Sequence, residues 1–197
     1  MGLRKASSYS RRYARPYTRK SSVKSKSYIK TIPPQKIVRF KMGSIKDYED
    51  GKLKFILRLV SSESILIRDN AIESARQYVH KILEEKLLGQ YYFEVRVYPH
   101  HILRENKMLT GAGADRMQTG MTLSFGVTMG RAAMIKAEQD IFLIATLNEK
   151  ARSLSVKALE KIKAKLPCHA RIVMETSKLQ ESKILDSSQN SKKILKS

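Results

Sequence analysis

The stretch DNAIESARQYVHKILEEKLLG, residues 69–89, decides the class of fold that this chain can form. Its apolar residues recur every three or four positions, a spacing that places them on one side of an α-helix. Asp69 suits the N-cap position and Gly89 suits a helix stop, so we predict a helix from 69 to 88. The stripe expected to face a core consists of Ile72, Ala75, Val79, Ile82 and Leu83.

Segments with the two-residue alternation of β-strands lie on both sides of this helix. Residues 93–97, for example, alternate apolar and polar side chains, and Pro99 ends the pattern. The strands expected from such patterns are 36–42, 54–60, 93–97, 121–125, 132–136, 141–147 and 171–175.

A second amphipathic helix is expected from 148 or 149 to about 166, where Pro167 closes it. The order strand, helix, strand then occurs twice, which favours one α+β domain with two helices on one face of a mixed or antiparallel sheet. A length of 197 residues suits one such domain with tails. We place a basic arm at 1–34, the globular domain at 35–176 and a flexible tail rich in Ser and Lys at 177–197.

The chain has 39 Lys and Arg against 18 Asp and Glu, a formal net charge of +21. Such an excess repels itself in a compact protein unless a polyanion neutralises it, and nucleic acid is the partner that fits best. An anionic membrane is the competing partner, but the sequence has no apolar run near the roughly 20 residues that span a bilayer. The start of the chain lacks the apolar stretch of a signal peptide, so we expect a cytosolic protein.

The first acidic residue of the chain is Asp47, although cations are frequent from the start. Guanidinium groups bind phosphates through paired hydrogen bonds and tyrosine rings stack on unpaired bases, so this composition favours an arm that orders on RNA. A merely solubilising tail is the alternative. The cations are Arg4, Lys5, Arg11, Arg12, Arg15, Arg19, Lys20, Lys24, Lys26 and Lys30, interleaved with Tyr9, Tyr13, Tyr17 and Tyr28.

A later stretch has little to anchor it in a core. The small residues at 111–114 leave few side chains to bury, so we predict a projecting loop at about 104–120. The backbone of Gly111 and Gly113 could present N–H groups to a phosphate, but the spacing of a nucleotide-binding P-loop is missing. The cations around these glycines, which suit insertion into folded RNA, are Arg104, Lys107 and Arg116.

An enzymatic or metal site is the least favoured interpretation. His100, His101, Glu105 and Asp115 could form one, but neighbouring residues on a strand point to opposite faces, which disfavours a chelate by the two histidines. No general base with a positioned partner is identifiable. Cys168 is the single cysteine and is interpreted as a small packed residue, because it has no second thiol. We expect no cofactor, no metal and no small-molecule substrate.

The run VRVYPHHILRENKMLTGAGADRMQTGM, residues 95–121, resembles the signature of one family of large-subunit ribosomal proteins. This is the universal L-sixteen family, in its archaeal and eukaryotic L-ten-e form. Shorter matches are RPYTR at 15–19, FKMG at 40–43 and IRDNAIESAR at 67–76. Together these matches span roughly residues 15 to 175.

The resemblance implies a hammerhead-like α+β fold and a structural place on the large subunit of the cytoplasmic ribosome, beside the A site and near the 5S rRNA. It implies a loop directed toward the peptidyl-transferase centre and the acceptor arm of tRNA, entry late in subunit maturation, and neighbouring ribosomal proteins as partners. The loop residues carried over are Arg104, Asn106, Lys107, Met108, Gly111, Gly113, Arg116 and Gln118. The residues expected to bind rRNA are Arg4, Lys5, Arg11, Arg12, Arg15, Tyr17, Arg19, Lys20, Lys24, Lys26 and Arg131.

The sequence departs from the family pattern just after the loop. Thr122 stands where a basic residue is common, and Val127 and Thr128 stand where the family has Lys-Pro. Arg131 could replace one of the missing cations.

A free RNA-binding regulator or assembly factor, which uses the same surface without staying on the ribosome, is the competing hypothesis.

Overall fold

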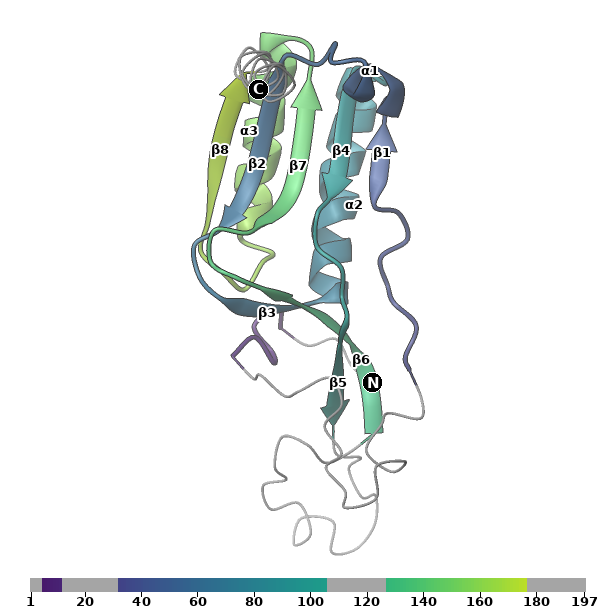
Figure 1. Ribbon diagram of the computed structural model, residues 1–197, viewed down its shortest axis with the longest axis vertical. Coiled ribbons are helices and arrows are strands. Elements are labelled where there is room, and N and C mark those ends of the chain that lie inside the picture. The colour runs from purple at the N-terminus through teal and green to yellow at the C-terminus, as the bar shows by residue number, and fades with distance from the viewer. Residues whose placement is uncertain (1–4, 12–31, 106–126, 177–197) are drawn as a thin grey trace, which may run out of the picture.

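The computed structural model describes residues 5–11, 32–105 and 127–176, which form two antiparallel sheets and three helices (Figure 1). The five-stranded sheet has the order β1 (Lys41–Gly43), β4 (Tyr91–Val95), β7 (Asp140–Thr146), β2 (Phe55–Ser61) and β8 (Ala170–Thr176). The three-stranded sheet has the order β3 (Ile65–Arg68), β6 (Val127–Ile135) and β5 (His101–Glu105). The helices are α1 (Ile45–Glu49), α2 (Asp69–Leu87) and α3 (Glu149–Lys163). The predicted α+β class is confirmed, with antiparallel pairing throughout the described strands.

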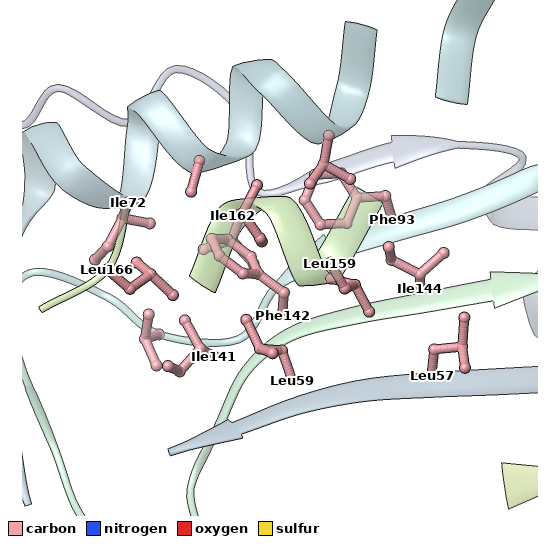
Figure 2. Packing of buried hydrophobic residues seen from close by; sticks show 14 of the residues in the cluster. Leu57, Leu59, Ile72, Phe93, Ile141, Phe142, Ile144, Leu159, Ile162 and Leu166 are labelled. Atoms are coloured by element: carbon pink, nitrogen blue, oxygen red, sulfur yellow. The ribbon is translucent and has the colours of Figure 1, made fainter. Parts of the chain in front are cut away.

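The core lies between the five-stranded sheet and the two long helices. Figure 1 shows α2 and α3 on one face of that sheet, and Figure 2 shows apolar side chains from both layers meeting between them. Truncating one such buried side chain to alanine typically costs about 2–5 kcal/mol, so this layer holds the fold together. The side chains labelled in Figure 2 are Leu57, Leu59, Ile72, Phe93, Ile141, Phe142, Ile144, Leu159, Ile162 and Leu166, and all of them are buried.

The helix α2 has the predicted stripe and a slightly different start. Arg68 is the N-cap residue, so the prediction that Asp69 caps the helix is wrong. The expected end is confirmed, because Leu88 and Gly89 adopt left-handed backbone with φ of 32° and 80°. The buried stripe includes Ile72, Ala75, Val79 and Leu83, whereas Ile82 is half-buried.

Only the last part of the strand expected at 36–42 pairs with another strand, as β1. The residues before it have no regular secondary structure, because side chains of α2 accept their N–H groups. The N–H of Lys36 donates to the Asp69 carboxylate at 3.2 Å. The N–H of Val38 donates to the Glu73 carboxylate at 3.4 Å. Distant carboxylates therefore replace the strand pairing that the alternation predicts.

The elements β3, β5 and α1 were not predicted from the sequence. Arg104 and Glu105 belong to β5 and pair with β6, which itself starts earlier than the predicted 132–136. The helix α3 ends at Lys163 rather than near 166. The strand expected at 121–125, most of the predicted loop and the tail at 177–197 lie outside the described residues.

The three-stranded sheet is covered on both faces. On one face, Ile65 and Ile67 of β3 join the main core beside α2. On the other face, Leu66, Leu103 and Ala132 form a small separate cluster, and Tyr9 from the segment 5–11 packs against it. A piece of the N-terminal arm therefore covers part of this second face, while Met134 of β6 stays 53% exposed.

Candidate nucleic-acid interface

Several segments toward one end of the molecule contain cations and no acidic residue. The segments 5–11 and 32–40 and the strands β3 and β6 contain no Asp or Glu. Figure 1 shows β3, β5 and β6 at the opposite end of the long axis from α1. The cations of these segments are Lys5, Arg11, Lys36 and Arg39, which are exposed, and Arg68 and Arg131, which are half-buried. We call these six residues the cationic end.

The segment 5–11 is bound to β3. The N–H of Leu66 donates to the carbonyl oxygen of Ser10 at 3.0 Å, and Ser10 is buried. Tyr9 packs on the cluster around Leu66, as described above. Lys5 and Arg11, both predicted to bind rRNA, are thereby held at the two ends of a docked turn with their side chains exposed.

The segment before β1 is fixed at its base by Arg131. The Nε of Arg131 donates to the carbonyl oxygen of Pro33 at 2.7 Å. Arg131 was predicted to bind rRNA, which stays a prediction, and its described contact holds the point where the arm joins the domain. Pro33, the point from which the described segment 32–40 runs to β1, is therefore fixed to β6.

Two carboxylates near the cationic end are internal and already bonded. Asp69 is buried, and this burial raises its pKa despite the N–H groups of Asn70 and Lys36 that it accepts. Burial also acts to raise the pKa of Glu73, but hydrogen bonds from Arg76 and Gln77 and the charge of Arg76 outweigh it, so the pKa is lowered. Neither carboxylate is exposed enough to shield the six surface cations from a phosphate.

The open face of the five-stranded sheet has the opposite character, because carboxylates neutralise its cations. Arg58 lies 3.5 Å from Asp140 and also pairs with Glu175 across the neighbouring strand. Arg171 pairs with Glu138 beside them. Phosphates gain little from a surface whose cations are already paired, so the cationic end is the better candidate interface.

The two adjacent histidines are separated by burial. His101 is 1% exposed and neither ring nitrogen has a hydrogen-bond partner in the described structure, and this burial lowers its pKa. His100 is exposed and lies against Tyr98, with ring centroids 4.4 Å apart. Among the described residues, no three His, Cys, Asp or Glu side chains gather as metal ligands would.

Many residues predicted to bind RNA lie outside the described part of the chain. Those of the arm are Arg4, Arg12, Arg15, Tyr17, Arg19, Lys20, Lys24 and Lys26. Those of the loop are Asn106, Lys107, Met108, Gly111, Gly113, Arg116 and Gln118. Glu105 pairs with Val127 in the β5–β6 ladder, so residues 106–126 leave and re-enter the domain at neighbouring positions. No helix of the described residues is long and apolar enough to cross a membrane.

Comparison with known proteins identifies the family. The family model described as Ribosomal protein L16p/L10e matches residues 14–173. A large ribosomal subunit protein uL16 of Methanococcus maripaludis is 42% identical over 179 residues, which cover 90% of this chain and 97% of the relative. The protein of the same name from Thermofilum pendens is 42% identical over 161 residues, 81% of this chain and 89% of the relative. The chain belongs to the ribosomal protein L16p/L10e family.

Proposed function

We propose that this chain, a structural protein of the large ribosomal subunit and not an enzyme, binds large-subunit rRNA through its arm at 1–34 and the cationic end. The observation that carries the proposal is the set of six cations in segments without Asp or Glu, in contrast to the five-stranded sheet, where carboxylates pair with Arg58 and Arg171. Phosphate contacts give affinity and register, while the shape of the domain selects the site, because folded RNA is recognised largely by shape.

The roles within the arm follow from its described ends. Lys5 and Arg11 contact phosphates beside β3, where their turn is docked, and the other predicted arm residues continue that contact along the RNA. Arg131 acts by fixing the base of the arm at Pro33, and the nitrogens of its guanidinium that Pro33 does not use can still face RNA. The globular domain, 35–176, then acts as a rigid wedge with a hammerhead-like shape.

The finer placement concerns the loop at about 104–120. We place the domain between rRNA elements beside the A site, near the 5S rRNA, with the loop directed toward the peptidyl-transferase centre and the acceptor arm of tRNA. The β5–β6 ladder supports this, because pairing up to Glu105 and Val127 gives the intervening residues a firm base. Arg104, whose backbone pairs with Thr128, stands at that base. The protein joins late in maturation and completes the tRNA site.

The test compares two sets of substitutions that remove the same charge. The arm variant changes Arg12, Arg15, Arg19 and Lys20 to Gln, which leaves the docked segment 5–11 intact. The control changes four exposed lysines far from the cationic end, Lys46, Lys81, Lys86 and Lys150, to Gln. Binding of large-subunit rRNA is measured against salt for both proteins and the parent chain.

Each lost phosphate contact lowers the slope of log affinity against log salt by about 0.7–0.9. The arm variant should therefore lose roughly 3 from the slope if all four residues bind phosphates, and the control less than about 1. Equal losses would mean that net charge, rather than the arm, drives binding.

Sedimentation of ribosomes addresses the competing hypothesis, since a free regulator would be absent from finished large subunits.

A further inference from the structure

The chain between β4 and β5 turns every second side chain toward the surface. Arg96, Tyr98 and His100 are exposed, whereas Val95, Val97, Pro99 and His101 are buried. The segment joins the two sheets in the middle of the molecule (Figure 1). The N–H of His100 donates to the carbonyl oxygen of Tyr98 at 3.0 Å, so the chain turns tightly at these residues and brings their side chains together. Two of these three side chains are aromatic rings.

The two exposed rings contact each other, and Tyr98 also contacts a third, half-buried ring from another segment, Phe40. Phe40 lies beside this chain because the N–H of Val95 donates to its carbonyl oxygen at 2.8 Å. The rings of Phe40 and Tyr98 are stacked, with centroids 5.4 Å apart and planes 19° apart. The His100 ring lies 4.4 Å from the Tyr98 ring with the planes 43° apart, so this contact is tilted rather than stacked. Tyr98 nevertheless remains 41% exposed, so part of its ring is accessible to a ligand.

Cations flank this stack. Arg39 precedes Phe40, is exposed, and makes no ion pair with the described part of the chain. Arg96 lies two residues before Tyr98, and its side chain is 43% exposed although Glu94 lies 3.6 Å away. An exposed ring packed only for stability needs no cations beside it. Rings with guanidinium groups nearby match the chemistry that binds unpaired nucleotides.

We propose that Phe40, Tyr98 and His100 form a platform on which an unpaired RNA base stacks, with Arg39 and Arg96 on the adjoining phosphates. The occupant is single-stranded or bulged RNA, because a duplex keeps its base faces stacked inside the helix. The inference rests on the proposed rRNA binding and adds to it a base contact in the globular domain, separate from the arm and the loop.

The absence of tryptophan from the chain allows a direct probe. Tyr98→Trp places a single indole on the platform, and Tyr78→Trp places one on α2, where Tyr78 lies under Lys165. The titrant is an oligoadenylate of about ten nucleotides, compared with an abasic strand of equal length. Quenching of the platform indole by the oligoadenylate alone, with no quenching at position 78, is expected. Equal quenching by the abasic strand would overturn the platform.

The affinity for large-subunit rRNA supplies the second readout. Tyr98→Leu removes the ring but keeps an apolar contact with Phe40, and should weaken binding about ten-fold without changing the salt slope. Tyr98→Phe should restore the affinity, and Tyr78→Leu should leave it unchanged. If Tyr98→Leu binds rRNA as tightly as the parent, the inference is overturned. If this variant in addition enters subunits poorly, the rings bind a protein partner rather than RNA. Failure of the parent chain to bind rRNA would instead remove the proposed function itself.

Discussion

The guanidinium of Arg76 and the carboxylate of Glu73 form a two-bond ion pair inside the protein. Nε and an NH2 nitrogen of Arg76 lie 2.7 and 2.6 Å from the two oxygens of Glu73, and the side chains are 8% and 10% exposed. The same carboxylate accepts the N–H of Val38, and Arg76 also contacts the sulfur of Met42 at 3.0 Å. One ion pair on α2 therefore holds the segment that connects the arm to β1.

Arg76→Met should destabilise the fold severely, because it leaves the Glu73 carboxylate buried without its counter-charge. The expected loss is about 3–5 kcal/mol in the free energy of unfolding, measured by urea denaturation at pH 7. Lys81→Met on the same helix is the control, since its 3.8 Å pair with Glu85 is exposed and should contribute less than about 0.5 kcal/mol. Similar losses for the two variants would show that the buried pair has no special role.

Gly43→Ala should destabilise the protein more than Gly51→Ala, although both glycines have left-handed φ, +85° and +71°. A Cβ at position 43 would overlap the carbonyl oxygen of Tyr91, which also accepts the N–H of Ser44 at 2.8 Å. A Cβ at position 51 would meet nothing within 4 Å. We expect a loss of about 1–2 kcal/mol for Gly51→Ala from backbone strain alone. Gly43→Ala should lose roughly a further 1–3 kcal/mol from overpacking, and equal losses in thermal unfolding would contradict the crowding.

The sequence predicted those elements whose periodicity is local and long. The helix α2 repeats its stripe over several turns, so its position was clear from spacing alone. The strand β3 gave no alternation, because Ile65 and Ile67 enter the main core while Leu66 is covered by the arm segment. The helix α1 spans five residues, too few for a period. The bond from Lys36 to Asp69 joins residues 33 apart, which no local pattern contains.

The candidate interface was predicted in composition but not in placement. Clustered cations and the missing acids indicated RNA from the sequence alone. The docking of Ser10 on Leu66 and the anchoring of Pro33 by Arg131 are tertiary contacts, so the position of the cationic end required the fold. His100 was considered only as a possible metal or base residue, because the strand alternation was predicted to end at Pro99 and nothing in that pattern places its ring against Tyr98.

His101 should make the protein sensitive to mild acid. Burial lowers the pKa of His101 in the folded protein below the ordinary 6.5. Between this lowered pKa and 6.5, the unfolded chain therefore binds more protons than the folded chain. The stability that neutral His101 contributes is complete above pH 6.5 and is lost as the pH falls through the lowered pKa of the folded protein. The free energy of unfolding falls there by at most about 1.4 kcal/mol per pH unit.

His101→Leu should reduce this pH dependence and keep or raise stability at pH 7.5, because two buried ring nitrogens without partners are removed. Urea unfolding at pH 7.5 and 5.5 measures the effect. His169→Leu, at an exposed position, is the matched control and should keep the slope of the parent. A parent-like acid response in His101→Leu would show that other groups cause it.

Shortening the loop should separate its role from that of the domain. Replacing residues 108–117 by a short Gly-Ser linker leaves β5 and β6 paired up to Glu105 and Val127, so thermal unfolding of the domain should change little. The proposed position of the loop predicts large subunits that contain the variant but bind tRNA poorly in the A site or mature slowly. Deleting the ten residues 188–197 shortens the tail instead and should alter neither property. Normal tRNA binding and maturation with the shortened loop would refute its direction toward the peptidyl-transferase centre, while leaving rRNA binding by the cationic end intact.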